Sequence, residues 1–92
     1  MLTDPARING VTSRIIGSAV SVHRALGPGL LESTYTACLV ADLRANGCDV
    51  ACQVPVSLTY QGTRLDVGYR IDILVQNLVM VEVKAASAQP QG

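Results

Sequence analysis

The chain has 92 residues, enough for one small domain, and its 49% hydrophobic content can supply a buried core. Aromatic residues make up only 3%, with no Phe or Trp, so that core must be built from Val, Leu, Ile and Ala. The formal net charge is zero. Strong non-specific nucleic-acid binders usually carry a basic excess. Any positive potential for such a ligand must therefore be local, come from a bound metal, or arise by oligomerisation.

The sequence predicts a cytoplasmic protein with no membrane association. No apolar run approaches the roughly 20 residues of a membrane span, and residues 1–9 lack the charged-then-apolar pattern of a secretory signal. The three cysteines, Cys38, Cys48 and Cys52, are odd in number, which favours free thiols. Zinc requires about four nitrogen or sulfur ligands. Only His23 could join the cysteines, so no zinc site is expected.

A first helix is predicted after Asp4. This residue fits an N-cap, and Pro5 fits the first helical position. Apolar residues then recur at spacings of three and four, which is typical of a helix with one buried stripe. The helix is expected to end at the Gly-Pro-Gly sequence of residues 27–29. The predicted stripe is Ile8, Val11, Ile15, Ala19, Val22 and Leu26.

A second helix is predicted to begin near Leu30 or Leu31. Gly47 suits the position just after its C-terminus. Glu32 would lie in the first turn, where the helix dipole favours a carboxylate. The inner side of this helix is expected to hold Leu31, Tyr35, Cys38 or Leu39, and Asp42 or Leu43.

From Cys48 the hydrophobic period changes from 3.6 to 2, which indicates strands. Residues 61–62 (Gln-Gly) read as a turn, and Gly68 inside an apolar run suggests a bulge or bend. A second turn is expected near residues 76–77, followed by a strand over residues 78–85. The predicted fold class is therefore α+β (α/β in the broad sense): two N-terminal helices followed by an antiparallel meander of three or more strands.

Three charged residues, Asp72, Glu82 and Lys84, interrupt otherwise apolar strands. Charged side chains inside β-branched runs lose hydration unless they are paired or bind a ligand. Two carboxylates and an ammonium are the groups needed to hold a divalent metal and a water molecule beside a phosphodiester. The alternative is a cross-strand ion pair on a solvated face, worth under about 1 kcal/mol.

The strand register decides whether Asp72 joins the other two. Glu82 and Lys84 are two residues apart, so they share one side of their strand. Asp72 lies directly opposite Glu82 only if the connecting loop has an odd number of residues centred on Asn77. A two-residue turn at Gln76 and Asn77 would place Asp72 on the opposite face of the sheet. The sequence alone leaves both registers open.

The sequence between the two helices carries a family resemblance. Gly29, Glu32 and Tyr35 form a Gly-x-x-Glu-x-x-Tyr pattern, which resembles the GxxExxY protein family of the PD-(D/E)XK nuclease superfamily. Residues 22–24 (Val-His-Arg) and residues 53–56 (Gln-Val-Pro-Val) look like the family's Val-His segment and its Gln-containing first strand. Asp72, Glu82, Val83 and Lys84 match the superfamily's Asp and Glu-x-Lys, while Ile71 stands where the superfamily name has Pro.

The resemblance implies roles for these residues. In such nucleases the Mg²⁺ or Mn²⁺ ligands would be Asp72, Glu82, the Val83 carbonyl and Glu32. Lys84 would orient or activate the attacking water and stabilise charge on the phosphate. Gln53 would be a polar contact to the substrate near the site. Oxygen ligands suit Mg²⁺, and a metal together with a lysine can neutralise charge that develops in the transition state.

The resemblance also implies a fold and a function. The restriction-endonuclease-like core has helices around a mixed central sheet, with the site at a split in the sheet, and it continues beyond the Glu-x-Lys strand. Residues 1–84 are therefore expected to form a single C-terminally incomplete domain, with residues 85–92 as a tail. A core of this kind is expected to complete itself as a homodimer or higher homo-oligomer. The expected function is metal-dependent phosphodiester hydrolysis in DNA or RNA; the alternative is a non-catalytic interaction or regulatory module.

Three further residues receive structural interpretations. His23 is predicted to be a polar helix residue near a C-terminus, because no catalytic partner is visible. Tyr35 is expected to be a packed aromatic whose hydroxyl is bonded to a neighbour. Gly29 is expected to serve backbone geometry.

Overall fold

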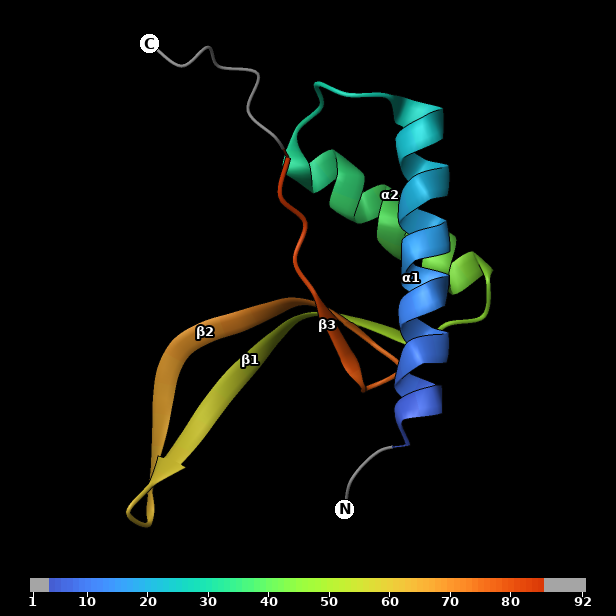
Figure 1. Ribbon diagram of the computed structural model, residues 1–92. Helices are drawn as coiled ribbons and strands as arrows, with labels where there is room; N and C mark the ends of the chain where they lie inside the picture. Colours follow the sequence, from blue (N-terminus) through green and yellow to red (C-terminus); the bar gives the residue numbers. More distant parts are fainter. Residues whose placement is uncertain (1–3, 86–92) are drawn as a thin grey trace, which may run out of the picture.

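The computed structural model describes residues 4–85, which form two helices followed by a three-stranded antiparallel sheet in the order β1-β2-β3 (Figure 1). The elements are α1 (Pro5–Leu26), α2 (Glu32–Ala45), β1 (Val50–Tyr60), β2 (Thr63–Val75) and β3 (Val79–Val81). This confirms the α+β prediction. The mixed sheet that the resemblance implied is not observed, because both strand pairings within residues 4–85 are antiparallel. No helix in this range is long and apolar enough to cross a bilayer.

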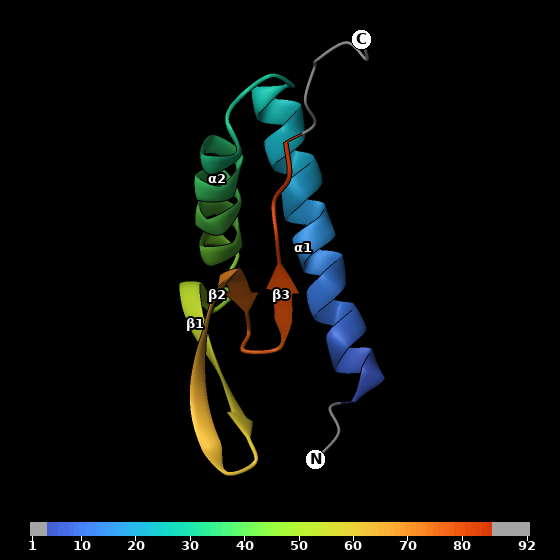
Figure 2. The ribbon, with the colours of Figure 1, turned by 90° about the vertical axis from the view of Figure 1, so that its left-hand side faces the viewer.

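Helix α1 begins as the sequence predicts. The Asp4 side chain accepts a hydrogen bond of 3.0 Å from the backbone N–H of Ala6, and Pro5 occupies the first helical position. The buried face holds Val11, Ile15, Ser18 and Val22. Ile8 was expected on this face but is 37% exposed, because the N-terminal end of the helix extends beyond the β2–β3 loop (Figure 2).

Helix α2 ends in a Schellman motif. Gly47 has a φ of +85°, its N–H donates to the Arg44 carbonyl, and the Cys48 N–H donates to the Leu43 carbonyl, each at 3.0 Å. The predicted role of Gly47 is confirmed. The prediction for Leu31 is wrong: it is 75% exposed, because it is the N-cap and precedes the apolar stripe of the helix. The buried residues of α2 are Leu39, Val40 and Leu43.

The β1–β2 hairpin has the predicted turn and the predicted bulge. Gln61 and Gly62 both have positive φ, +49° and +77°, which is the two-residue turn that matches the twist of paired strands. Tyr69 pairs with Val56, whereas the neighbouring Ser57 pairs with Asp66, so two extra residues of β2 bulge out around Gly68. The residues before and after Gly68 belong to one continuous strand, β2.

The β2–β3 connection has an odd number of residues. Val75 pairs with Val79 and Ile73 pairs with Val81, which leaves a three-residue loop centred on Asn77. Asn77 and the residue before it adopt left-handed conformations that make this loop possible. Of the strand predicted over residues 78–85, the part that pairs is shorter, Val79–Val81.

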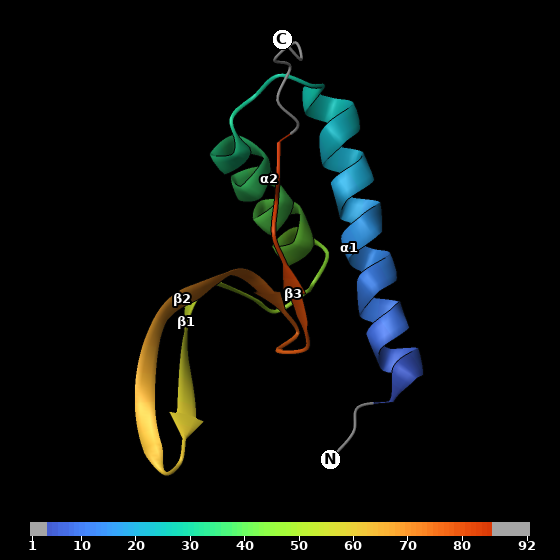
Figure 3. The ribbon, with the colours of Figure 1, turned by 60° about the vertical axis from the view of Figure 1, so that its left-hand side comes forward.

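The core lies where both helices pack on one end of the sheet. It is formed by Val11, Ile15, Leu39, Val40, Leu43, Cys48, Val50, Ile73 and Val75. The other end of the β1–β2 ribbon projects away from the helices as an arm (Figures 1 and 3). The radius of gyration is 15.8 Å, compared with about 12 Å for a compact chain of this length. The arm explains this difference.

Candidate functional site

The strand register aligns three of the predicted site residues across the sheet. Pairs on either side of Gln53 place it opposite Asp72, and the β2–β3 register, continued by one residue, places Asp72 opposite Glu82. The sequence had left this second alignment open, and the three-residue loop decides it. Gln53 has a φ of +53°, which is costly for a residue with a Cβ, and its regular pairing with Asp72 is interrupted at this point.

A surface cleft of about 540 Å³ brings predicted residues from four segments together. Glu32 comes from the first turn of α2, Gln53 from β1, Asp72 from β2, and Val83 from the segment after β3. The other residues that line the cleft are Ser33, Thr36, Ala37, Val40, Arg44 and Cys52. The cleft therefore unites four of the six residues that the family resemblance singled out.

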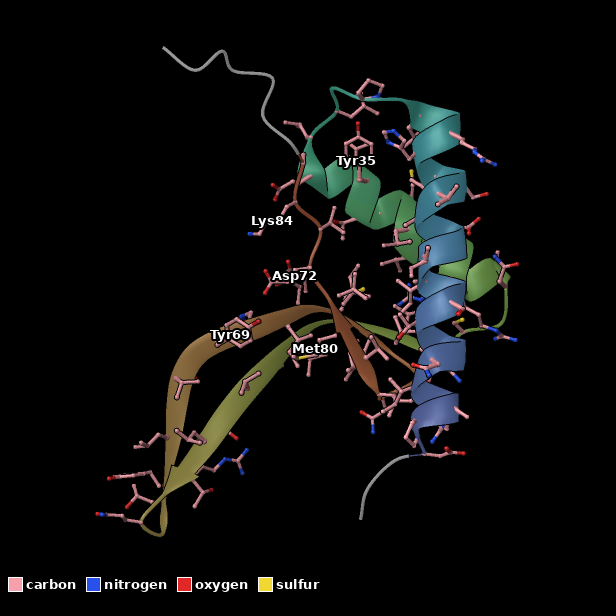
Figure 4. All side chains as sticks on the ribbon, in the orientation of Figure 1. Tyr35, Tyr69, Asp72, Met80 and Lys84 are labelled. Carbon is pink, nitrogen blue, oxygen red and sulfur yellow. The ribbon has the colours of Figure 1, made fainter. Side chains whose placement is uncertain are left out.

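The Glu82 carboxylate is held by two neighbours. The Tyr69 hydroxyl donates a hydrogen bond of 2.9 Å to Glu82 Oε1, and Lys84 Nζ lies 3.8 Å from Glu82 Oε2. This hydrogen bond raises the pKa of Tyr69 above its ordinary value of 10.0, with further contributions, in decreasing order, from the charge of Glu82, desolvation and the charge of Asp72. In the view of Figure 4, Tyr69, Asp72 and Lys84 all lie on the side of the molecule away from α1.

Glu32 connects α2 to the segment that follows β3. Its Oε2 accepts a hydrogen bond of 3.0 Å from the backbone N–H of Ala85. The position of Glu32 in the first helical turn also satisfies the helix dipole, as the sequence predicts. In this arrangement one oxygen of the Glu32 carboxylate is already occupied by a protein donor.

The carboxylates do not converge on one point. Among residues 4–85, no group of three or more His, Cys, Asp or Glu side chains is placed to hold a metal ion. Glu82 and Lys84 line a second cleft of about 470 Å³ between the helices and the segment after β3, and Val83 lines both clefts. The expected convergence of three acids is therefore not observed, because Glu32 is bonded to Ala85 and Glu82 to Tyr69.

Tyr35 holds the loop between the helices. Its hydroxyl donates to the Gly27 carbonyl at 2.6 Å and accepts from the Leu30 N–H at 3.1 Å (Figure 4). The prediction of a packed tyrosine with a bonded hydroxyl is confirmed. Gly29, with a φ of +93°, serves backbone geometry as expected. His23 is an exposed residue in the last turn of α1.

Sequence reasoning missed two residues of this region. Tyr69 lies thirteen residues before Glu82, and only the bend of β2 and the three-strand register bring the two side chains together. Arg44 lines the cleft with Asp72, and its guanidinium donates to the Val50 carbonyl at 2.9 Å. An arginine in the last turn of a helix gives no local signal of such a position, because the helix dipole alone accounts for it.

The donor set suits a hard cation. The carboxylates of Asp72 and Glu82 and the Val83 carbonyl are oxygen ligands of the type that Mg²⁺ and Mn²⁺ prefer. Glu32 could join them only after exchanging its bond to Ala85. The chemistry of the residues fits the ion, although their arrangement in this structure does not form a complete set of ligands.

Comparisons with known proteins agree with this chemistry. The family profile of the PD-(D/E)XK nuclease superfamily matches residues 9–91, nearly the whole chain. No significant match was found to a curated protein or to a solved structure. The two-helix, three-strand architecture is consistent with a restriction-endonuclease-like fold, and the narrower GxxExxY assignment stays a prediction. The chain belongs to the PD-(D/E)XK nuclease superfamily.

Proposed function

We propose that this protein is a metal-dependent nuclease that hydrolyses phosphodiester bonds in DNA or RNA. The observation that supports the proposal is the three-residue β2–β3 loop, whose register, extended by one residue beyond β3, puts Asp72 opposite Glu82 in the backbone. Membership of a nuclease superfamily supports the same chemistry.

In this proposal, Mg²⁺ or Mn²⁺ is held by the carboxylates of Asp72 and Glu82 and by the Val83 carbonyl, with Glu32 as a further ligand. The ion supplies Lewis acidity and lowers the pKa of water. Lys84 is 76% exposed, and by exchanging its 3.8 Å contact with Glu82 its ammonium would reach a phosphate oxygen and stabilise the negative charge that develops there. Gln53, on the wall of the cleft, offers an amide to the substrate.

The first test compares Mn²⁺ binding and cleavage in matched variants. Asp72→Asn removes a proposed ligand charge with little change in shape. Asp66→Asn is the control, because Asp66 lies on the same strand but on the arm, and Asn keeps the acceptor for the Gly68 N–H. Calorimetry should show Mn²⁺ binding lost only in Asp72→Asn, and cleavage should fall about 100-fold or more. Equal Mn²⁺ binding by both variants and the unchanged protein would remove the proposal.

The second test separates metal binding from phosphate chemistry. Lys84→Ala should retain Mn²⁺ binding and lose cleavage, because the ammonium acts on the phosphate and is not a ligand. Arg64→Ala on the exposed arm is the matched loss of one positive charge and should leave both properties unchanged. If Arg64→Ala lost as much cleavage as Lys84→Ala, the activity would depend on the overall positive charge and not on the position of Lys84.

A second candidate function is a non-catalytic nuclease-fold module. It is favoured by the lack of three gathered metal donors within residues 4–85 and by the zero net charge of the chain. This candidate predicts neither Mn²⁺ binding nor cleavage in a folded protein. The same calorimetric titration therefore distinguishes the two functions.

A further inference from the structure

One face of the long hairpin is apolar along its whole length. In β2 every second residue from Leu65 to Val75 is apolar, and the same alternation runs through β1. Ile73 and Val75, at the helix end of this face, are completely buried. Leu65 and Val67, at the arm end, are 40% and 48% exposed. The helices therefore cover only about half of a continuous apolar face.

The uncovered half is defined by cross-strand pairs. Leu58 pairs with Leu65, and Val56 pairs with Tyr69, so these side chains share one face. We call this surface the arm face: Val56, Leu58, Leu65 and Tyr69 from these pairs, together with Tyr60 and Val67, which continue the apolar alternation in sequence, Val67 within the bulge. The opposite face of the arm carries Ser57, Thr59, Arg64 and Asp66. The ribbon is thus amphipathic, and water contacts its apolar side.

This exposure is energetically unfavourable. A two-stranded ribbon without a covered apolar face is marginally stable in water. From their exposed fractions, the side chains of the arm face leave about 450 Å² of apolar surface in water, as much as the largest patch on a typical monomer. A partner that covers this surface would stabilise the arm.

We propose that the arm face is the interface of a homodimer, in which the arm of a second copy of this chain covers it. The face has no Lys, Arg, Asp or Glu, and the chain carries no net charge, so two copies meet without repulsion. Pairing two arm faces would bury about 900 Å² of apolar surface in all, which is most of the roughly 1,200 Å² at the lower end of specific interfaces.

The chemistry of the arm face favours protein over nucleic acid. Phosphates require cations, and the arm places its two arginines on the polar side, where Asp66 offsets part of their charge. Tyrosine is enriched and charged residues are depleted at the centre of protein–protein interfaces, and the arm face has two tyrosines and no charged residue. A face that pairs with its own copy about a two-fold axis needs to be complementary only to itself.

The interface would adjoin the candidate site. Tyr69 belongs to the arm face, and its hydroxyl is bonded to Glu82. The dimer proposal does not depend on nuclease activity, since it rests on the arm alone. If both proposals hold, the two candidate sites of a dimer lie at the bases of the paired arms.

The test is the mass of the protein in solution. Light scattering after size-exclusion chromatography should give a dimer for the unchanged protein at concentrations up to roughly 200 μM. Leu58→Glu places a charge in the centre of the arm face and should weaken the dimer about 100-fold or more. Thr59→Glu is the matched control, because this neighbour lies on the polar face, and it should remain a dimer.

Circular dichroism of each variant separates dissociation from unfolding. If Leu58→Glu fails to fold, Leu65→Glu with Arg64→Glu as its polar-face control repeats the comparison on the partner strand. A monomeric mass for the unchanged protein over the whole concentration range overturns the proposal, as does a dimer that persists in a folded arm-face variant. Dissociation caused equally by Thr59→Glu would also overturn it, because it would place the interface elsewhere.

Discussion

The Tyr35 hydroxyl gives the sharpest stability test of the structure. It donates to the Gly27 carbonyl at 2.6 Å and accepts from the Leu30 N–H at 3.1 Å, so it fastens both ends of the loop between α1 and α2. Tyr35→Phe removes the hydroxyl and keeps the ring. A hydrogen bond of this kind contributes about 0.5–1.5 kcal/mol. The Leu30 N–H is exposed and can donate to water after the substitution. We therefore expect the free energy of unfolding to fall by about 1–2 kcal/mol in total.

Urea unfolding followed by circular dichroism measures this loss as a lower transition midpoint, with the dependence of the unfolding free energy on urea concentration unchanged. Tyr60→Phe is the chemically matched control, because Tyr60 lies near the tip of the arm and is 62% exposed. It should lose much less stability at the same protein concentration. A Tyr35→Phe variant within about 0.3 kcal/mol of the unchanged protein would refute the structural role of the hydroxyl. Loss of Mn²⁺-dependent cleavage with unchanged stability would instead assign Tyr35 to the chemistry.

Three further predictions follow from local geometry and charge. Gly47→Ala should lower the free energy of unfolding by about 1–2 kcal/mol in the same urea assay, since Gly47 has a φ of +85°. An added Cβ would meet no atom within 4 Å, so this cost comes from the backbone conformation and not from a clash. Its control, Gly17→Ala in the middle of α1, should be neutral or stabilising. Asp4→Ala removes the N-cap of α1 and should lose about 1 kcal/mol, seen as a melting temperature lower by roughly 4–8 °C. Glu82→Gln should lower the pKa of Tyr69 towards 10.0, which tyrosinate absorbance measures; an unchanged titration contradicts the hydrogen bond. Because that pKa is raised in the folded protein, the linked stability is present below pH 10 and is lost as the pH rises above it.

Much of the fold could be predicted because its signals are local. The N-cap at Asp4, the glycine at position 47 and the Gln61–Gly62 turn each depend on the conformational preferences of a few adjacent residues. The alternation of apolar residues in β1 and β2 predicts which side of each strand is apolar. It does not predict how much of that side is covered, because coverage depends on where the helices end relative to the sheet.

The candidate site was predicted in its residue types and only partly in its arrangement. The family resemblance selected Glu32, Gln53 and Asp72, and the structure places all three around one cleft. Their roles stay proposals. The hydrogen bonds from Ala85 to Glu32 and from Tyr69 to Glu82 join segments that are distant in sequence, and no local pattern indicates them.

By itself, the sequence determined the helices, the turns and the two-residue alternation of the strands, since short-range sterics and solvation act within a few residues. Only the tertiary structure decided the three-residue loop at Asn77, because loops of two and three residues were both compatible with the local sequence. The one-residue difference in loop length decides whether Asp72 lies opposite Glu82 or on the other face of the sheet. The exposed arm was likewise settled by packing, since the two helices cover only one end of a long hairpin.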